Sequence, residues 1–249
     1  MSPTIAFLAS FASILIGAAT GMVLKRSLPP DMLEGGSKEF IRLAAGFLAT
    51  LAALVIGLMI ASAKNTYDSQ NTNVRQLGTN AVLVDQMLVK YGPEAGAART
   101  LLREIIPSAT ARIWRENTQG TGGATFIVSQ TAERFYNAIE GLRPANAEQT
   151  SLKSRIIAIT TEMGRTRLLV FTQSDNAIPV PFFIVLTFWL VVIFASLLAE
   201  PSRIVIASIL VFAISVSSAL FLIVDLSHPF EGLMQISNHH LQMVMPKIE

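Results

Sequence analysis

The sequence predicts an all-α membrane protein in which four transmembrane helices carry a soluble helical-bundle domain, inserted between the second and the third. Three observations predict this class. Of the 249 residues, 51% are hydrophobic and 14% are charged, whereas soluble domains carry about 25% charged residues. Four apolar runs are each long enough to cross about 30 Å of hydrocarbon as a helix. The polar segment between the second and third runs has helical spacing of its apolar residues and no alternating strand pattern.

The overall composition excludes several classes of function. The 19 basic and 17 acidic residues give a formal net charge of +2, which is too balanced for a nucleic-acid-binding surface, so no nucleic-acid partner is expected. The chain has no cysteine, so disulfides and cysteine-based metal sites are excluded. The N-terminal run lacks a basic start and stays apolar for longer than the core of a signal peptide. We therefore expect it to be a retained membrane helix.

The four predicted transmembrane helices cover residues 3–24, 43–63, 178–199 and 204–224. Only residues 200–203 separate the last two, and such a short link forces an antiparallel hairpin. In this link we expect Pro201 to stop the third helix and Ser202 to cap the fourth.

Four spans give the chain a defined topology. Both termini and the segment 64–177 lie on one side of the membrane, and the loop 25–39 and the link 200–203 lie on the other. The basic residues near the two membrane surfaces nearly balance, so the positive-inside rule does not assign the cytoplasmic side. The predicted domains are a first helix pair (1–63), a soluble helical domain (64–177), a second helix pair (178–226) and a C-terminal tail (227–249).

The second transmembrane helix is predicted to continue into water as one long rod, from Phe40 to Tyr91. No proline occurs between Lys38 and Gly92, so nothing in this stretch breaks a helix. Beyond the membrane, apolar residues recur at spacings of three and four, which is typical of a coiled-coil-like seam. The seam consists of Val74, Leu77, Ala81, Val84, Leu88 and Tyr91.

Three further helices are expected in the soluble domain, over residues 93–117, 125–142 and 146–173. Pro107 should kink or interrupt the first of them. The glycine-rich stretch 118–124 is expected to form a turn or mobile loop. The last helix should lead almost directly into the third transmembrane helix.

Small residues on the first transmembrane helix indicate close packing. Ser10, Ser13, Gly17 and Gly21 lie along one face, and the two glycines form a GxxxG pair that lets another backbone approach closely. Two interpretations remain open, namely tight packing inside one subunit and a dedicated oligomer interface.

The sequence contains no recognisable catalytic signature. It has no HExxH, GxSxG or GxxxxGK[ST] motif, so we do not expect an enzyme. The three histidines, His228, His239 and His240, lie near the C-terminus, and adjacent side chains point in different directions on a helix. Neither a metal site nor a cofactor is expected.

One face of the second transmembrane helix is small and then cationic. In a symmetric oligomer this face could line a pore around the axis, with Lys64 forming a ring. Alternatively, the small residues permit close helix packing and Lys64 extends toward the headgroups. Asp225, at the end of the fourth helix, needs a partner there, and Lys64 is a candidate on the same side of the membrane. The candidate pore-lining residues are Gly46, Thr50, Ala53, Gly57, Ile60 and Lys64.

A second membrane cation, Arg42, stands at the start of the same helix. Its long side chain either reaches the headgroups or makes a polar contact at a pore mouth.

Five strings in the chain resemble the bestrophin-like family of bacterial membrane proteins, and their order and spacing agree over nearly the whole sequence. The family pattern has Arg before the Pro-Phe pair near the C-terminus, where this chain has His228. The strings are RLAAGFLATLAALVIGLMIASAKNTYDSQN (42–71), VRQL (74–77), YGPEA (91–95), IPVPFFIVLTFWLVVIF (178–194) and HPFEGLMQIS (228–237).

The resemblance carries expectations about function. Bestrophins are homopentameric anion channels whose second membrane helix lines a narrow neck, extended by a helical cytosolic region. The resemblance therefore implies a pentameric chain in the bacterial inner membrane, with a cytoplasmic soluble domain, lipids around it and small anions such as chloride passing along the second helix. No acidic cluster follows the fourth helix, so calcium gating is not expected. The alternative is a non-conducting membrane sensor or scaffold whose helical domain binds a partner.

Overall fold

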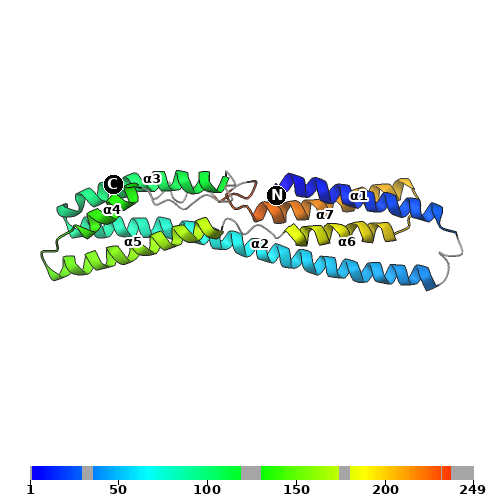
Figure 1. Cartoon of the computed structure of the whole chain (residues 1–249), viewed down its shortest axis with the longest axis horizontal. Helices are drawn as coiled ribbons and strands as arrows, with labels where there is room; N and C mark the ends of the chain where they lie inside the picture. Colours follow the sequence, from blue (N-terminus) through cyan, green and yellow to red (C-terminus); the bar gives the residue numbers. More distant parts are fainter. Residues whose placement is uncertain (1, 30–35, 119–129, 174–179, 231, 237–249) are drawn as a thin grey trace. The chain divides into compact units, whose positions relative to one another are not determined.

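The computed structural model describes residues 2–29, 36–118, 130–173, 180–230 and 232–236, and within these residues the chain is helical without any strand. The predicted all-α class is therefore confirmed. The loop predicted at 118–124 lies, except for Thr118, outside the described residues. The helices are α1 (Pro3–Ser27), α2 (Gly36–Tyr91), the 3-10 turn η2 (Pro93–Ala95), α3 (Gly96–Thr118), α4 (Gln130–Glu140), α5 (Ala147–Gln173), α6 (Val180–Ser196) and α7 (Arg203–Leu226) (Figure 1).

The chain divides into two compact units. The first unit comprises Met1–Thr66 and Asn176–His228, and the second comprises Tyr67–Asp175 and Pro229–Glu249. Helix α2 is continuous over 56 residues and contributes to both units, as the absence of proline predicts. Each unit has its own apolar core.

Three helices, α1, α2 and α7, are long and apolar enough to cross a membrane. The remaining predicted span is the apolar helix α6, which has 17 residues and so reaches about 25 Å at about 1.5 Å per residue, against about 30 Å of hydrocarbon. The helix ends at Ser196 instead of the predicted residue 199. The φ of Leu198 is 42°, a left-handed conformation that ends a helix. A crossing by α6 therefore stays a prediction.

The start of α7 and the end of α1 agree with the predicted topology of the first unit. The hydroxyl of Ser202 accepts a hydrogen bond from the Val205 amide at 3.3 Å, so the predicted cap is confirmed. Lys25, at the end of α1, forms an ion pair with Glu200 at 2.9 Å. The hydrogen bond from Lys25 and its charge lower the pKa of Glu200. The pair brings the end of α1 to the link between α6 and α7.

The GxxxG pair of α1 packs against α6 inside the subunit. A Cβ atom added to Gly17 would lie 2.6 Å from the carbonyl oxygen of Val191, and one added to Gly21 would lie 2.5 Å from that of Ala195. Both distances are shorter than van der Waals contact, so only glycine allows this approach. The structure thus supports the first of the two interpretations, packing within one chain.

Replacing either glycine of this pair by alanine should destabilise the first unit. Because the added methyl group meets backbone, which cannot rotate away, we expect Gly17→Ala and Gly21→Ala each to cost about 1–3 kcal/mol, the usual range for overpacking. Unfolding by SDS titration in mixed micelles measures this cost.

Gly36→Ala is the matched control, since a Cβ atom at Gly36 meets nothing within 4 Å. Equal stability of Gly17→Ala and Gly36→Ala would contradict the packing described here.

The second unit is built on the predicted seam of α2. All six seam residues are buried, with exposed fractions from 0% at Val84 to 9% at Leu77. Most of them pack in one core with residues of α3, α4 and α5, including Leu102, Phe135 and Ile156. Val74 and Leu77 pack in a neighbouring cluster with Val170 of α5 and with Phe230 and Ile236 of the tail.

The remaining helices of this unit begin and end close to their predicted positions. Helix α3 starts only after the turn η2, and Pro107 lies inside it without interrupting it. Of the two predicted effects of Pro107, an interruption does not occur, with Leu102 and Ile106 of this helix buried, and a kink stays a prediction. At the start of α5, the side-chain oxygen of Asn146 accepts a hydrogen bond from the Gln149 amide at 2.8 Å.

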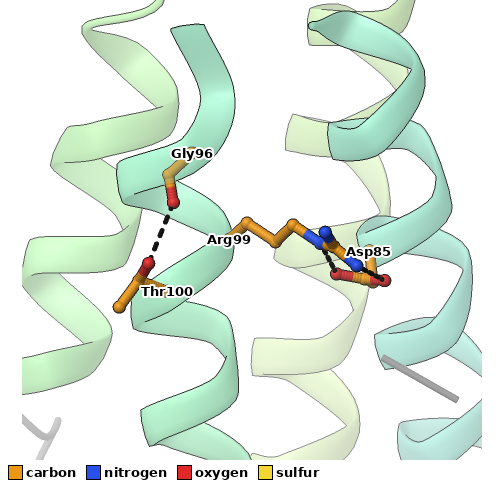
Figure 2. A network of polar contacts seen from close by, with 4 residues as sticks. All are labelled: Asp85, Gly96, Arg99 and Thr100. Carbon is orange, nitrogen blue, oxygen red and sulfur yellow. Dashed lines mark hydrogen bonds and ion pairs between the residues drawn. The ribbon is translucent and has the colours of Figure 1, made fainter. Parts of the chain in front are cut away.

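A buried ion pair connects α2 to α3 (Figure 2). Asp85 of α2 is 3% exposed and binds Arg99 of α3 through two hydrogen bonds, at 2.7 Å and 3.2 Å. The hydrogen bond to Asp85 raises the pKa of Arg99, and the charge of Asp85 adds to this. The pair therefore fixes how these two helices are aligned.

Removing one partner of this pair should destabilise the second unit far more than removing both. Asp85→Ala leaves a largely buried guanidinium without its carboxylate and should cost roughly 3 kcal/mol. Asp85→Ala combined with Arg99→Leu should recover part of this loss. Amide hydrogen exchange over α2 and α3 reports the change.

Lys90→Ala provides the comparison, because its pair with Glu148 has both side chains about two-thirds exposed and should be worth less than about 1 kcal/mol. Additive losses in the Asp85 and Arg99 double variant would contradict the coupling.

Candidate functional site

Within the first unit, helix α2 has three distinct faces. Its buried residues Ala52, Met59 and Ala63 pack in the core of the unit. At about 100° per residue, the small residues predicted to line a pore lie about a third of a turn from that face. A third face, again about a third of a turn away, carries large exposed side chains. These are Phe40, Leu43, Phe47, Leu54 and Leu58, which are 67–71% exposed.

All six candidate pore-lining residues, Gly46, Thr50, Ala53, Gly57, Ile60 and Lys64, are exposed. A Cβ atom added to Gly46 or Gly57 meets nothing within 4 Å. The small face is therefore not used for close packing among the described residues of its own chain, in contrast to Gly17 and Gly21 of α1. The function of this face stays a prediction.

Beyond Lys64 the same face of α2 is partly buried, although Asp68 and Arg75 on it are exposed. Tyr67 is partly buried and packs with Val74, which is 1% exposed. The run of exposed small residues therefore ends near Lys64, and beyond it this face has both buried and exposed side chains.

The two residues of the predicted Lys64–Asp225 pair differ in how much solvent they contact. Lys64 is exposed on α2, whereas Asp225 is 1% exposed near the end of α7. Both belong to the first unit, and the pairing itself stays a prediction. Close to Asp225, the Nδ1 atom of His228 lies 2.8 Å from the carbonyl oxygen of Val224.

A basic cavity of about 420 Å³ lies in the first unit beside the start of the small face. Lys25 of α1 and Arg42 and Gly46 of α2 line it, together with residues from the end of α6. The sequence identified Arg42 as a cation at the membrane boundary, but it contained no signal that Lys25 and the end of α6 would share a cavity with it.

A second cavity, of about 120 Å³, lies in the second unit between α2, α3, α4 and α5. Its walls are mostly apolar and include Leu102, Phe135 and Met163. At its edge, the hydroxyl of Tyr136 donates a hydrogen bond to the carbonyl of Thr160 at 2.8 Å, and burial raises the pKa of Tyr136. The sequence did not predict this cavity either.

Metal-ligating side chains do not gather in the part of the chain that the structure describes, where no group of three or more His, Asp or Glu could hold an ion. His239 and His240 lie outside the described residues. What the described residues bring together is a small exposed face with a cation near each end.

Comparison with known protein families finds a match. A family model described as the Bestrophin-like domain matches residues 12–241, nearly the whole chain. No curated protein and no solved structure matches it.

Proposed function

We propose that the chain, which belongs to the bestrophin-like family, forms a homo-oligomeric anion channel in the bacterial inner membrane, with its second membrane helix lining the path. The match confirms the resemblance of the five strings and supports a bestrophin-related, channel-like function at the level of the family. The observation that carries the finer proposal is the small, exposed face of α2. In the assembled protein, α6 completes four crossings and the second unit lies in the cytoplasm.

The three faces of α2 fit an arrangement around an axis. The face with Ala52 and Met59 packs in its own chain, and the face with the large apolar side chains provides contact with lipid or a neighbouring copy. The small face then borders the axis, where Gly46 and Gly57 leave room for an aqueous path.

The cations on α2 favour anions along such a path. Arg42 and Lys64 are both exposed and stand 22 residues apart, which corresponds to about 33 Å of helix and so to the thickness of the hydrocarbon core. Rings of Arg or Lys select anions in pores, and positive charge at a pore mouth raises the local anion concentration. Each copy in the oligomer adds one such pair of charges.

Cysteine cross-linking should show which face of α2 meets other copies at the axis. The chain has no native cysteine, so Thr50→Cys and Gly57→Cys each introduce a single thiol. We expect disulfide-linked dimers at these positions, because equivalent residues approach one another around a narrow axis.

Leu54→Cys and Leu58→Cys are the controls on the large apolar face and should cross-link less. Stronger cross-linking at the leucine positions, or a monomer in native mass spectrometry, contradicts the axial arrangement.

Charge reversal at Lys64 should change ion selectivity. A unit charge acts on an ion about 7 Å away with roughly 0.6 kcal/mol in water, and reversing it changes this energy by about twice as much. Several copies together should therefore lower the chloride-to-sodium permeability ratio by at least about tenfold in Lys64→Glu. Planar-bilayer recordings of purified protein measure the reversal potential.

Lys90→Glu is the matched control, since Lys90 lies on the same helix but outside the exposed small face. Absence of anion current in the unaltered protein, or equal selectivity of Lys64→Glu and Lys90→Glu, would refute the proposal.

The cavity in the second unit favours a second candidate function, that of a non-conducting sensor or scaffold. Its volume of about 120 Å³ is close to that of engineered apolar cavities, about 150 Å³, that bind benzene. A small apolar molecule bound there would contact four helices at once. A stable monomer or dimer without anion current would favour this function over the channel.

A further inference from the structure

The basic cavity of the first unit combines two cations with an apolar wall. Lys25 and Arg42 supply the charge, and Ser196 adds a hydroxyl. The rest of the lining is apolar or small and comes from α2, α6 and the turn after α6. These residues are Ile41, Ala45, Gly46, Ala49, Ile193, Leu197 and Leu198.

The charge balance at this cavity leaves a net positive charge. Lys25 is paired with Glu200, whose carboxylate is largely exposed, whereas Arg42 forms no ion pair among the described residues. The last carbonyl groups of α6 carry partial negative charge at this end of the helix. An anion in the cavity must therefore be held by the two cations, chiefly by Arg42.

The position of the cavity matches a membrane boundary. Lys25 lies in the last turn of α1, and Arg42 stands directly before the apolar stretch of α2. A ligand here has water on the charged side and hydrocarbon on the apolar side, which is the environment of a phospholipid headgroup and its first acyl carbons.

We propose that this cavity binds an anionic phospholipid. The guanidinium of Arg42 and the ammonium of Lys25 contact the headgroup phosphate, for which arginine offers paired donors and lysine a point charge. The wall around Ala45, Ala49 and Ile193 covers the start of one acyl chain. The bound lipid fills the space between α2 and the end of α6, beside the small face of α2. A bound lipid phosphate neutralises Arg42, so Lys64 then remains as the cation on the proposed path, and the lipid site itself does not depend on whether the chain conducts ions.

Lipid titration of the full chain tests the proposal. Protein purified in a mild non-ionic detergent is titrated with phosphatidylglycerol or with zwitterionic phosphatidylcholine, and bound lipid is counted by native mass spectrometry. We expect phosphatidylglycerol to bind preferentially. Arg42→Gln should weaken its binding about tenfold, which corresponds to about 1.4 kcal/mol.

Two further variants separate charge from shape. Ala49→Leu keeps both cations but fills the apolar side, and it should also lower the binding of phosphatidylglycerol. Arg42→Lys keeps the charge and loses the paired donors, so its affinity should lie between those of the unaltered protein and Arg42→Gln. Far-UV circular dichroism and gel filtration identify the variants that fold, and Ala49→Leu still tests the site if Arg42→Gln does not fold.

Arg203→Gln is the matched control, because it removes an exposed cation at the start of α7 that does not line the cavity. Its lipid binding should equal that of the unaltered protein. Equal losses in Arg42→Gln and Arg203→Gln, or equal binding of the two lipids, would overturn the proposal. Full displacement of the lipid by millimolar inorganic phosphate would also overturn it, since the site would then belong to a free anion.

Discussion

In the first unit, helix α2 buries little of its apolar surface against its own chain. Only 11% of the residues in an 18-residue apolar stretch of α2 are buried, against 28% in α1 and 22% in α7. Helices α1, α6 and α7 form the packed part, which depends on the backbone contact at Gly17 and Gly21. In a membrane, each exposed face of α2 must contact lipid, another copy of the chain or water. The proposals for this protein follow from that requirement.

The side chains on the different faces of α2 differ in size, and this difference suits each face to different surroundings. Large apolar side chains such as Phe47 and Leu54 lose water contact favourably in hydrocarbon or in an interface. The small face with Gly46 and Gly57 has little apolar area to bury, so lipid contact gains little there. Arg42 and Lys64 are exposed cations near the two ends of this run of small residues. The basic cavity lies on the flank of this face, and a bound anionic lipid there would support α2 where its own chain leaves space.

Much of the fold could be predicted because it depends on local patterns. The spacing of Val84 and Leu88 predicts the buried face of α2, and Ser202 predicts the start of α7 through a side chain that satisfies its own helix. The end of α6 could not be predicted, since it depends on the left-handed conformation of Leu198, which leucine adopts only at a cost. The continuity of α3 through Pro107 depends on tertiary burial, which outweighs the local cost of proline.

For the candidate site too, features set by local sequence could be predicted, whereas features set by tertiary packing could not. Periodicity identified the small face from Gly46 to Lys64, but whether that face is packed or exposed depends on where α1, α6 and α7 lie. Glycines occur in the apolar stretches of both α1 and α2, yet Gly17 and Gly21 meet another backbone whereas Gly46 and Gly57 meet nothing within 4 Å. The basic cavity depends on three segments far apart in the sequence, so no local pattern predicts it.

If the small face of α2 borders water in the assembled protein, residues along it are accessible to reagents dissolved in water. Single cysteines placed in turn from Leu43 to Lys64, in protein reconstituted into liposomes, can be labelled with a membrane-impermeant thiol reagent. We expect labelling that recurs every three to four residues and coincides with Gly46, Thr50, Ala53, Gly57 and Ile60. Labelling confined to the two ends of the helix, or centred on Phe47, Leu54 and Leu58, would contradict it.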